Sequence, residues 1–129
     1  MAAQETLKLV AIVDDDELIR NALQGLMKEA GFRALAFASA EEFLNSGKQD
    51  HTACLIADIR MPGMSGLDLQ SKLNEGHYMI PIIFITAQGD EKMRMQALRA
   101  GAVEFLTKPF DDEVLLDSVR AALSSQLDS

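Results

Sequence analysis

The chain has 129 residues, of which 48% are hydrophobic and 25% are charged, and this balance is typical of one soluble globular domain, not of a disordered tail. Its formal net charge of −8 argues against direct binding to nucleic acid, because affinity for a duplex comes mainly from lysines and arginines that neutralise phosphates. No apolar stretch approaches the roughly 20 residues that a membrane span requires, and residues 1–6 lack the pattern of a signal peptide. We therefore expect a single cytoplasmic domain over residues 1–129.

The chain begins with an apolar run, a helical pattern and a second short run. Residues 7–13 form an apolar run interrupted by Lys8, with β-branched residues near its end, which predicts a buried strand that three aspartates terminate. The next segment has apolar residues at helical spacing and ends at Gly31, which suits a left-handed C-terminal cap. Those apolar residues are Leu18, Ile19, Ala22, Leu23, Leu26 and Ala30. Residues 33–37 are predicted to form the second strand.

The middle of the chain contains an apolar run between two helix starts. Residues 54–58 precede a turn rich in proline and glycine, so they predict a strand buried on both faces, with Cys54 as a core residue. Ser39 is the first residue of a capping box that predicts a helix start before this strand, and Ser65 begins a similar pattern that predicts a helix start after it. The predicted spans are 39–46 and 65–75 for the two helices and 47–52 for a polar loop.

Two further strands and two further helices complete the pattern. Residues 81–86 are an apolar run with proline tolerated at its first position. A helix over residues 90–100 leads to a fifth strand over residues 104–107, and a final amphipathic helix runs over residues 111–124. Five strands that alternate with five helices predict an α/β fold, in which a parallel sheet carries helices on both faces and the crossovers are right-handed.

Strongly polar residues lie at the ends of four of the five predicted strands. They are Asp14 and Asp15 after the first run, Asp58 in the third, Thr86 in the fourth and Lys108 after the fifth. Ligands of an open parallel sheet bind outside the carboxyl ends of its strands. We therefore expect these five side chains to meet at one edge of the sheet, although they are scattered along the sequence.

The five residue types together suit phosphoryl chemistry. Crowded carboxylates repel one another unless a cation lies among them, and Mg²⁺ prefers such oxygen ligands. No cysteine or histidine lies near these positions, which disfavours zinc, and His51 and His77 fall in predicted loops. A magnesium ion, an ammonium group and a hydroxyl group can hold a phosphoryl group. Aspartate can attack phosphorus, and Asp58 on the central strand is the candidate nucleophile.

Each residue also has an ordinary structural interpretation. Asp58 could cap the following turn, Thr86 could cap a helix or a turn, and Lys108 could be a surface lysine before a proline. Taken singly, these interpretations are favoured; taken jointly, the convergence of five residues favours a site.

The same positions resemble the receiver domain of two-component response regulators over nearly the whole chain. Four segments carry the resemblance: Val13-Asp14-Asp15-Asp16, the run from Asp58 to Gly66, Thr86-Ala87, and the run from Gly101 to Phe110. The segment from Gly89 to Gly101 is most similar to the FixJ-like subgroup. The resemblance implies a doubly wound, flavodoxin-like sheet with strand order 2-1-3-4-5, and a signalling switch without turnover of a separate substrate.

The resemblance also assigns roles at the site. Asp58 would accept a phosphoryl group from the phosphohistidine of a sensor histidine kinase. The Mg²⁺ ligands would be the side chains of Asp14, Asp15 and Asp58 and the backbone carbonyl of Arg60. Lys108 would pair with the phosphoryl oxygens, Thr86 would donate its hydroxyl group to them, and the peptide bond before Pro109 would be cis.

A switch would follow from these contacts. Movement of Thr86 toward the phosphoryl group would leave space for the ring of Phe105, which is otherwise a core residue. The change would remodel the face made by residues 90–100, 104–107 and the final helix, and that face dimerises in the FixJ-like subgroup. Met95, Leu98 and Val103 are the candidate contacts.

Three other functions are consistent with parts of the pattern. A magnesium-dependent aspartyl-phosphate phosphatase would carry an acid two residues after the nucleophile, where this chain has Arg60. A scaffold that is never phosphorylated would not need all five residues. A mononucleotide-binding protein would have a glycine-rich loop after the first strand.

Overall fold

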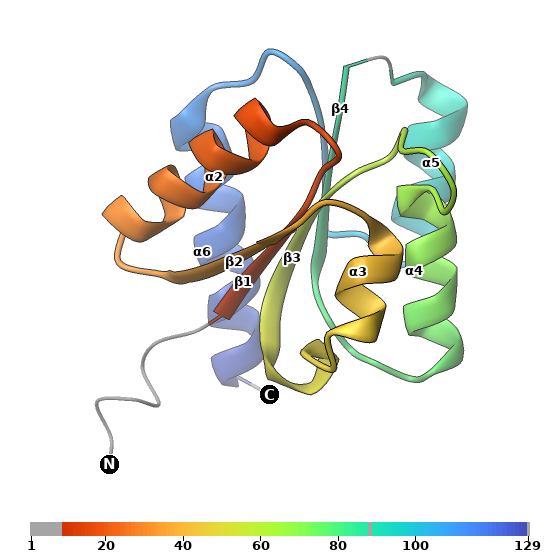
Figure 1. The fold of residues 1–129 in the computed structure, drawn as a ribbon, viewed down its shortest axis with the longest axis horizontal. Coiled ribbons are helices and arrows are strands. Elements are labelled where there is room, and N and C mark those ends of the chain that lie inside the picture. The colour runs from red at the N-terminus through yellow and green to blue at the C-terminus, as the bar shows by residue number, and fades with distance from the viewer. Residues whose placement is uncertain (1–8, 88, 129) are drawn as a thin grey trace.

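A computed structural model describes residues 9–87 and 89–128, so positions 7 and 8 of the predicted first strand lie outside the described residues. Five parallel strands form one sheet in the order β2-β1-β3-β4-β5, which confirms the expected order (Figure 1). The strands are β1 Leu9–Val13, β2 Arg33–Phe37, β3 Thr52–Asp58, β4 Ile82–Thr86 and β5 Glu104–Thr107. The central strand β3 is buried along its full length, as predicted.

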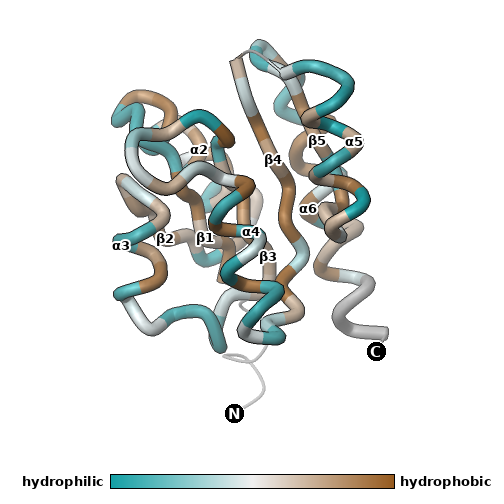
Figure 2. The backbone as a smooth tube through the Cα atoms, turned by 90° about the vertical axis from the view of Figure 1, so that its right-hand side faces the viewer, coloured by the Kyte–Doolittle hydropathy of each residue, from teal (hydrophilic) through white to brown (hydrophobic). Residues whose placement is uncertain are grey.

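In the part of the chain that the structure describes, five α-helices cover the two faces of the sheet. They are α2 Glu17–Glu29, α3 Ala40–Asn45, α4 Gly66–Glu75, α5 Glu91–Arg99 and α6 Asp112–Asp128, and a short 3₁₀ helix spans Gln49–His51. Helices α2 and α6 lie on one face, and α3, α4 and α5 lie on the other (Figure 1). The hydropathy colouring of Figure 2 shows apolar strands between helices whose outer sides are polar.

The strands contribute side chains to two separate apolar cores, because successive side chains of a strand point to opposite faces of the sheet. Along β1, Val10 and Ile12 pack in the core under α2 and α6. Ala11 and Val13 pack in the core under α3, α4 and α5. The pattern is the one expected of a parallel sheet covered on both sides.

Side-chain caps fix where several helices begin. Ser65 and Asp68 form the reciprocal capping box of α4, as predicted. At α3 the Oγ atom of Ser39 accepts the N–H of Glu42 at 3.0 Å, but the Glu42 carboxylate accepts from Ala38 at 2.9 Å instead of returning to Ser39. The predicted box at Ser39 is therefore only half formed.

The apolar face of α2 differs from the sequence prediction. Leu18 is 78% exposed and Ala22 is also exposed, whereas Met27 is fully buried. Leu18 lies in the first turn of the helix, and the line that faces the sheet runs instead through Leu23 and Met27, one helical repeat apart.

Three element boundaries also differ from the prediction. The predicted loop over residues 47–52 contains the 3₁₀ helix, and Thr52 already belongs to β3. The Oγ1 atom of Thr52 donates to the carbonyl of Lys48 at 2.8 Å, which ties the loop to the start of the strand. Helix α6 continues to Asp128, four residues beyond the predicted end.

Two smaller expectations concern single features. Cys54 is buried, and burial raises the pKa of its thiol to about 12, so the thiol is an apolar core group. In the described residues, no helix combines the length and the apolar character that crossing a membrane would need.

Candidate functional site

The site begins at the carboxyl end of β1, where an acidic turn follows Val13. Asp14 is fully buried and Asp15 is exposed. The backbone N–H of Asp14 donates to the carbonyl of Phe37 at 3.2 Å, and the Oδ1 atom of Asp14 accepts the N–H of Asp16 at 2.9 Å. The turn is thus held by β2 on one side and by its own carboxylate on the other.

Asp58 ends β3 next to this turn, and its side chain is almost buried. Its Oδ1 atom accepts the backbone N–H of Arg60 at 3.3 Å. The N–H of Gly66 donates to the carbonyl of Ile59 at 2.9 Å, and a Cβ atom on Gly66 would collide with the carbonyl of Asp58. Glycine is therefore required where α4 begins, because its backbone passes against the end of β3.

Lys108 follows β5 and reaches both acidic strand ends. Its Nζ atom lies 3.3 Å from Oδ2 of Asp14 and 3.6 Å from Oδ2 of Asp58. Its backbone N–H donates to the carbonyl of Thr86 at 2.8 Å, which fixes the end of β5 beside the end of β4. The Lys108–Pro109 peptide bond is cis, as expected.

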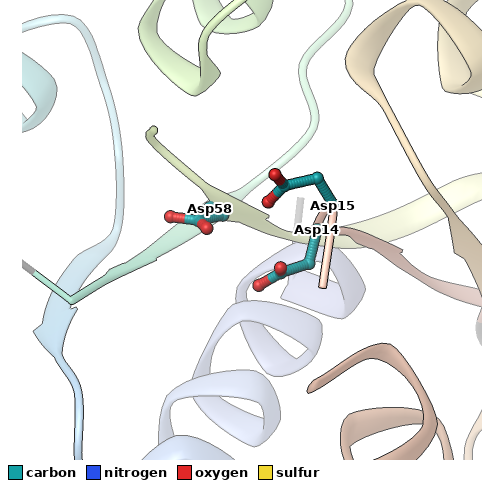
Figure 3. A group of neighbouring side chains, drawn as sticks. All are labelled: Asp14, Asp15 and Asp58. Carbon is teal, nitrogen blue, oxygen red and sulfur yellow. The ribbon is translucent and has the colours of Figure 1, made fainter. Parts of the chain in front are cut away.

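The electrostatics of the cluster are unbalanced. Oxygen atoms from Asp14, Asp15 and Asp58 lie within 4.8 Å of one another, and the three side chains stand side by side at the ends of β1 and β3 (Figure 3). Burial, and then the charge of Asp14, raise the pKa of Asp58. Lys108 and the backbone N–H groups of Arg60 and Ile59 oppose that rise without cancelling it. Among the described residues, the three carboxylates are paired with one ammonium group, that of Lys108, which leaves an excess of negative charge on the carboxylates.

The chemistry of the donor set fits a hard divalent cation. Within residues 9–87 and 89–128, the one group of histidine, cysteine or acidic side chains close enough to share a metal ion consists of carboxylates alone. Mg²⁺ is bound by carboxylate and carbonyl oxygens, whereas zinc and the softer metals favour nitrogen and sulfur. The cluster is therefore suited to Mg²⁺.

The remaining predicted residues lie around this edge. Thr86 is fully buried at the end of β4, one residue after Ile85, which pairs with Asp58 in the neighbouring strand. Phe105 is buried in β5, and a Cβ atom on Gly89 would lie 2.7 Å from its ring and 2.9 Å from the methyl group of Thr86. Thr86, Phe105 and the loop at Gly89 thus form one packed unit. The backbone of Arg60 contacts Asp58, as described above, while its side chain is exposed.

The candidate dimer contacts are only partly exposed. Met95 on α5 and Val103 before β5 are exposed apolar residues, whereas Leu98 is half-buried and packs against the core. A separate apolar groove of about 420 Å³ lies between α2 and the start of α6, and Lys108 is one of its lining residues. Its apolar lining consists of Ile19, Ala22, Leu23, Leu26, Pro109 and Phe110.

One contact of the acidic turn was not predicted from the sequence. The Nη1 atom of Arg20, on α2, donates to the backbone carbonyl of Asp14 at 2.8 Å. The signal available in the sequence was the position of Arg20, four residues after Asp16, where a long side chain on the second turn can reach back over the start of its helix.

Comparison with known proteins places the chain in a family. Residues 10–120 match the family described as response regulator receiver domain. The response regulator TmoT of Ectopseudomonas mendocina is 50% identical over 115 residues, which are 89% of this chain and 52% of TmoT. The transcriptional regulatory protein FixJ of Azorhizobium caulinodans is 38% identical over 114 residues, 88% of this chain and 54% of FixJ.

The solved structures agree with the sequence relatives. The crystal structure of FixJ-N superposes with a TM-score of 0.82 at 38% identity, covering 91% of this chain and 94% of that one. The chain belongs to the receiver-domain family of two-component response regulators, and FixJ-like regulators are among its relatives. It spans about half the length of the regulators that it matches.

Proposed function

We propose that this receiver domain is a switch that Asp58 operates by accepting a phosphoryl group. The observation that carries the proposal is the meeting of Asp14, Asp15, Asp58 and Lys108 at one edge of the sheet, with an excess of carboxylates. A buried aspartate with a raised pKa, beside an ammonium group and other acids, is the arrangement expected of a reactive group, and the bond that its Oδ1 atom accepts from the N–H of Arg60 in the following turn does not account for the other acids around it.

The transfer of the phosphoryl group to Asp58 is a displacement at phosphorus. An Oδ atom of Asp58 attacks the phosphorus of a phosphohistidine, a P–O bond forms, the P–N bond breaks, and the leaving imidazole nitrogen takes up a proton. Lys108 already lies 3.6 Å from Asp58 and can turn to the phosphoryl oxygens, and the Thr86 hydroxyl group can donate to them. The donor is a sensor histidine kinase, the partner that the family implies.

Mg²⁺ would be held by Asp14, Asp15, Asp58 and the carbonyl of Arg60. When bound, the ion supplies positive charge to the transferring phosphoryl oxygens and neutralises the crowded acids. The protein's part is to present those oxygens together, with Asp14 buried and Asp15 open to solvent.

The groove beside Lys108 is where we propose that the donor protein docks. A histidine that reaches Asp58 must be carried by a surface next to the pocket, and this groove shares Lys108 with it. Its apolar lining and the exposed Leu18 nearby on α2 would bury against the kinase. Replacing Leu18 with a charged residue should slow transfer from the kinase and leave transfer from a small phosphodonor unchanged.

The output of the switch is proposed to pass through Thr86 and Phe105. Because Thr86, Phe105 and Gly89 pack against one another, movement of Thr86 toward a phosphoryl group displaces the loop that leads into α5. Met95 and Val103 would then contribute to a homodimer formed on phosphorylation. Sedimentation with and without beryllofluoride and Mg²⁺ tests this step, and a monomer under both conditions contradicts it.

Turnover of a separate substrate is not part of the proposal. A phosphatase of this type would place an acid at position 60, where this chain has an exposed Arg60. Incubation with a generic phosphate ester should therefore release no phosphate beyond the slow hydrolysis of Asp58 phosphate itself. A scaffold function without phosphorylation would leave the charge-unbalanced cluster, with its buried Asp14 and Asp58, without a role.

The central experiment is the intact mass of the protein after incubation with acetyl phosphate and Mg²⁺. We expect one added phosphoryl group in the parent and none in Asp58→Asn, with the parent also unmodified when Mg²⁺ is chelated. A parent that stays unmodified, or an Asp58→Asn variant that gains the same mass, contradicts the proposal.

A further inference from the structure

Arg20 makes a contact with the acidic turn that differs in kind from that of Lys108. Lys108 places its charge directly on carboxylate oxygens of Asp14 and Asp58. Arg20 instead donates to the backbone carbonyl of Asp14, and it is absent from the ion pairs found among the described residues. It therefore touches the turn without occupying a carboxylate oxygen.

The carbonyl that Arg20 holds belongs to the peptide unit between Asp14 and Asp15. Rotation of that rigid, planar unit sets the direction in which the side chain of Asp15 leaves the backbone. The other bonds of the turn hold the N–H of Asp14 against Phe37 and the N–H of Asp16 against the Asp14 carboxylate. Arg20 is the contact that fixes the carbonyl lying between them.

The guanidinium group is well placed for this task because helix α2 begins immediately after the turn. Asp16 caps the helix, and the backbone N–H of Arg20 closes the first helical bond, to the carbonyl of Asp16 at 3.0 Å. The side chain then folds back over the start of the helix to reach Asp14 at 2.8 Å, in a partly buried position. Helix α2, which is packed on the sheet through Leu23 and Met27, thereby becomes a fixed support for the acidic turn.

We propose that Arg20 is a positioning residue of the metal site, and that it holds Asp15 in the direction from which its carboxylate can bind a divalent cation. The inference rests on the proposed function, since it assumes that the acidic cluster binds Mg²⁺. Partners that orient a metal ligand are a recognised determinant of metal affinity, and their loss typically costs about tenfold to a hundredfold.

The two roles that Arg20 could have predict opposite signs. A positive charge beside the acidic cluster repels Mg²⁺, so a purely electrostatic Arg20 would weaken binding, and its removal would strengthen it. A hydrogen bond that orients Asp15 strengthens binding, so its removal would weaken it. The direction of the change in Mg²⁺ affinity therefore separates the two roles.

The test is a Mg²⁺ titration of the full chain, followed by backbone amide signals in NMR spectra. We expect Arg20→Met to weaken the affinity by about tenfold, at the lower end of the usual range. The matched control is Arg120→Met on α6, which removes one positive charge from an exposed i,i+3 pair with Asp117 and should change the affinity by less than about twofold. Arg20→Lys keeps the positive charge but loses the geometry of the guanidinium group, so its affinity should be no higher than that of Arg20→Met.

A second background tests whether the effect passes through Asp15. In Asp15→Asn the carboxylate that Arg20 orients is gone, so Arg20→Met should add less than about a twofold further loss. Amide hydrogen exchange at Asp16 in the metal-free protein should be faster in both Arg20 variants than in the parent. This measurement needs no metal and keeps the proposal testable if either variant binds Mg²⁺ too weakly to titrate.

Three results would overturn the assignment: an Arg20→Met variant that binds Mg²⁺ as tightly as the parent or more tightly, a full tenfold loss that persists in Asp15→Asn, or unchanged exchange at Asp16. A parent that binds no Mg²⁺ would instead refute the proposed function, and the role of Arg20 with it. A parent that binds Mg²⁺ and gains the phosphoryl group, while Arg20→Met matches it, refutes the role of Arg20 alone.

Discussion

Helices α6 and α5 are held to the same sheet in different ways. Helix α6 packs through a stripe of buried apolar residues: Leu115, Leu116, Val119, Ala122 and Leu123. Helix α5 buries Ala97 alone, with Met93 and Leu98 half-buried. Its C-terminal end is tied to α4 by amide side chains, since Gln70 donates to the carbonyl of Ala97 at 3.0 Å and Asn74 donates to that of Ala100 at 3.1 Å.

The difference in packing distinguishes a firmly held helix, α6, from a helix that can shift on the sheet, α5. Apolar burial stabilises α6 without directional preference, whereas hydrogen bonds to α5 depend on geometry and can be made or broken by small shifts. Helix α5 is also the element connected to Thr86 through the loop at Gly89. The weakly packed helix is therefore the one that follows the proposed switch.

The largest expected effect comes from truncating one apolar side chain in each of the two helices. Leu115→Ala in α6 should lower the free energy of unfolding by about 2–5 kcal/mol, because the side chain is fully buried. Leu98→Ala in α5 should cost only about 1 kcal/mol, since that side chain is half-buried. Urea unfolding followed by circular dichroism measures both values. Equal losses of unfolding free energy in the two variants would contradict the proposed difference in packing between α6 and α5.

Two glycine substitutions sharpen the comparison, because the same added methyl group should have opposite effects. Gly89→Ala brings a methyl group against the buried Phe105 ring and the Thr86 methyl group, so it should destabilise the protein by about 1–3 kcal/mol. Gly25→Ala lies inside α2 with open space around it, so it should stabilise the protein by about 0.5–1 kcal/mol. Thermal unfolding of the pair decides this, and a neutral Gly89→Ala would show that the packing at Phe105 is loose.

The amide ties of α5 should differ in strength with their burial. Gln70→Ala removes a buried donor and leaves space between α4 and α5, so it should cost about 1–2 kcal/mol. Asn74→Ala removes an exposed bond and should cost about 0.5 kcal/mol. Hydrogen exchange at Gly101 and Ala102 should rise more in Gln70→Ala. Identical exchange in the two variants would mean that these amides do not hold the end of α5.

The last comparison concerns Asp58, at the carboxyl end of the sheet that both helices pack against. Because the pKa of Asp58 is raised, the folded protein binds this proton more tightly than the unfolded chain, and the ionised form is destabilising above the raised pKa. Metal-free Asp58→Asn should therefore melt a few degrees above the parent at pH 7, a shift that about 1 kcal/mol produces in a domain of this size.

That gain should shrink as the pH falls toward about 3.8, the ordinary pKa of the carboxyl group, because the parent then becomes protonated as well. It should also shrink when Mg²⁺ is added to the parent. Thermal unfolding with a chelator at pH 7 and pH 5 provides the measurement. An Asp58→Asn variant that melts below the metal-free parent at pH 7 would show that the pairing with Lys108 outweighs burial and the charge of Asp14.

The sequence was sufficient for the features set by local pattern. Periodicity predicts the apolar run that ends in Asp58 and the proline and glycine turn after it. The geometry of parallel sheets predicts that the polar residues at the ends of four strands lie at one edge. The reciprocal cap of Ser65 and Asp68 is likewise local, since both of its bonds span three residues.

Features that depend on the approach of distant elements were not accessible in this way. Leu18 fits a helical stripe as well as Met27 does, and the packing angle of α2 on the sheet decides which of them is buried. The bond from Gln70 to Ala97 joins a polar side chain to a backbone carbonyl 27 residues away, and a backbone carbonyl carries no sequence identity. No spacing rule marks such a pair.

The position of Lys108 bears on how quickly the pocket can respond to an incoming anion. Its distances of 3.3 Å and 3.6 Å to Asp14 and Asp58 are longer than the roughly 2.7–2.9 Å of a tight charge-assisted bond. The ammonium group is shared loosely between two acids and has no single short contact to give up. The ammonium group of Lys108 can therefore turn toward a new negative group without breaking a tight ion pair, and it is already next to Asp58 when that group arrives.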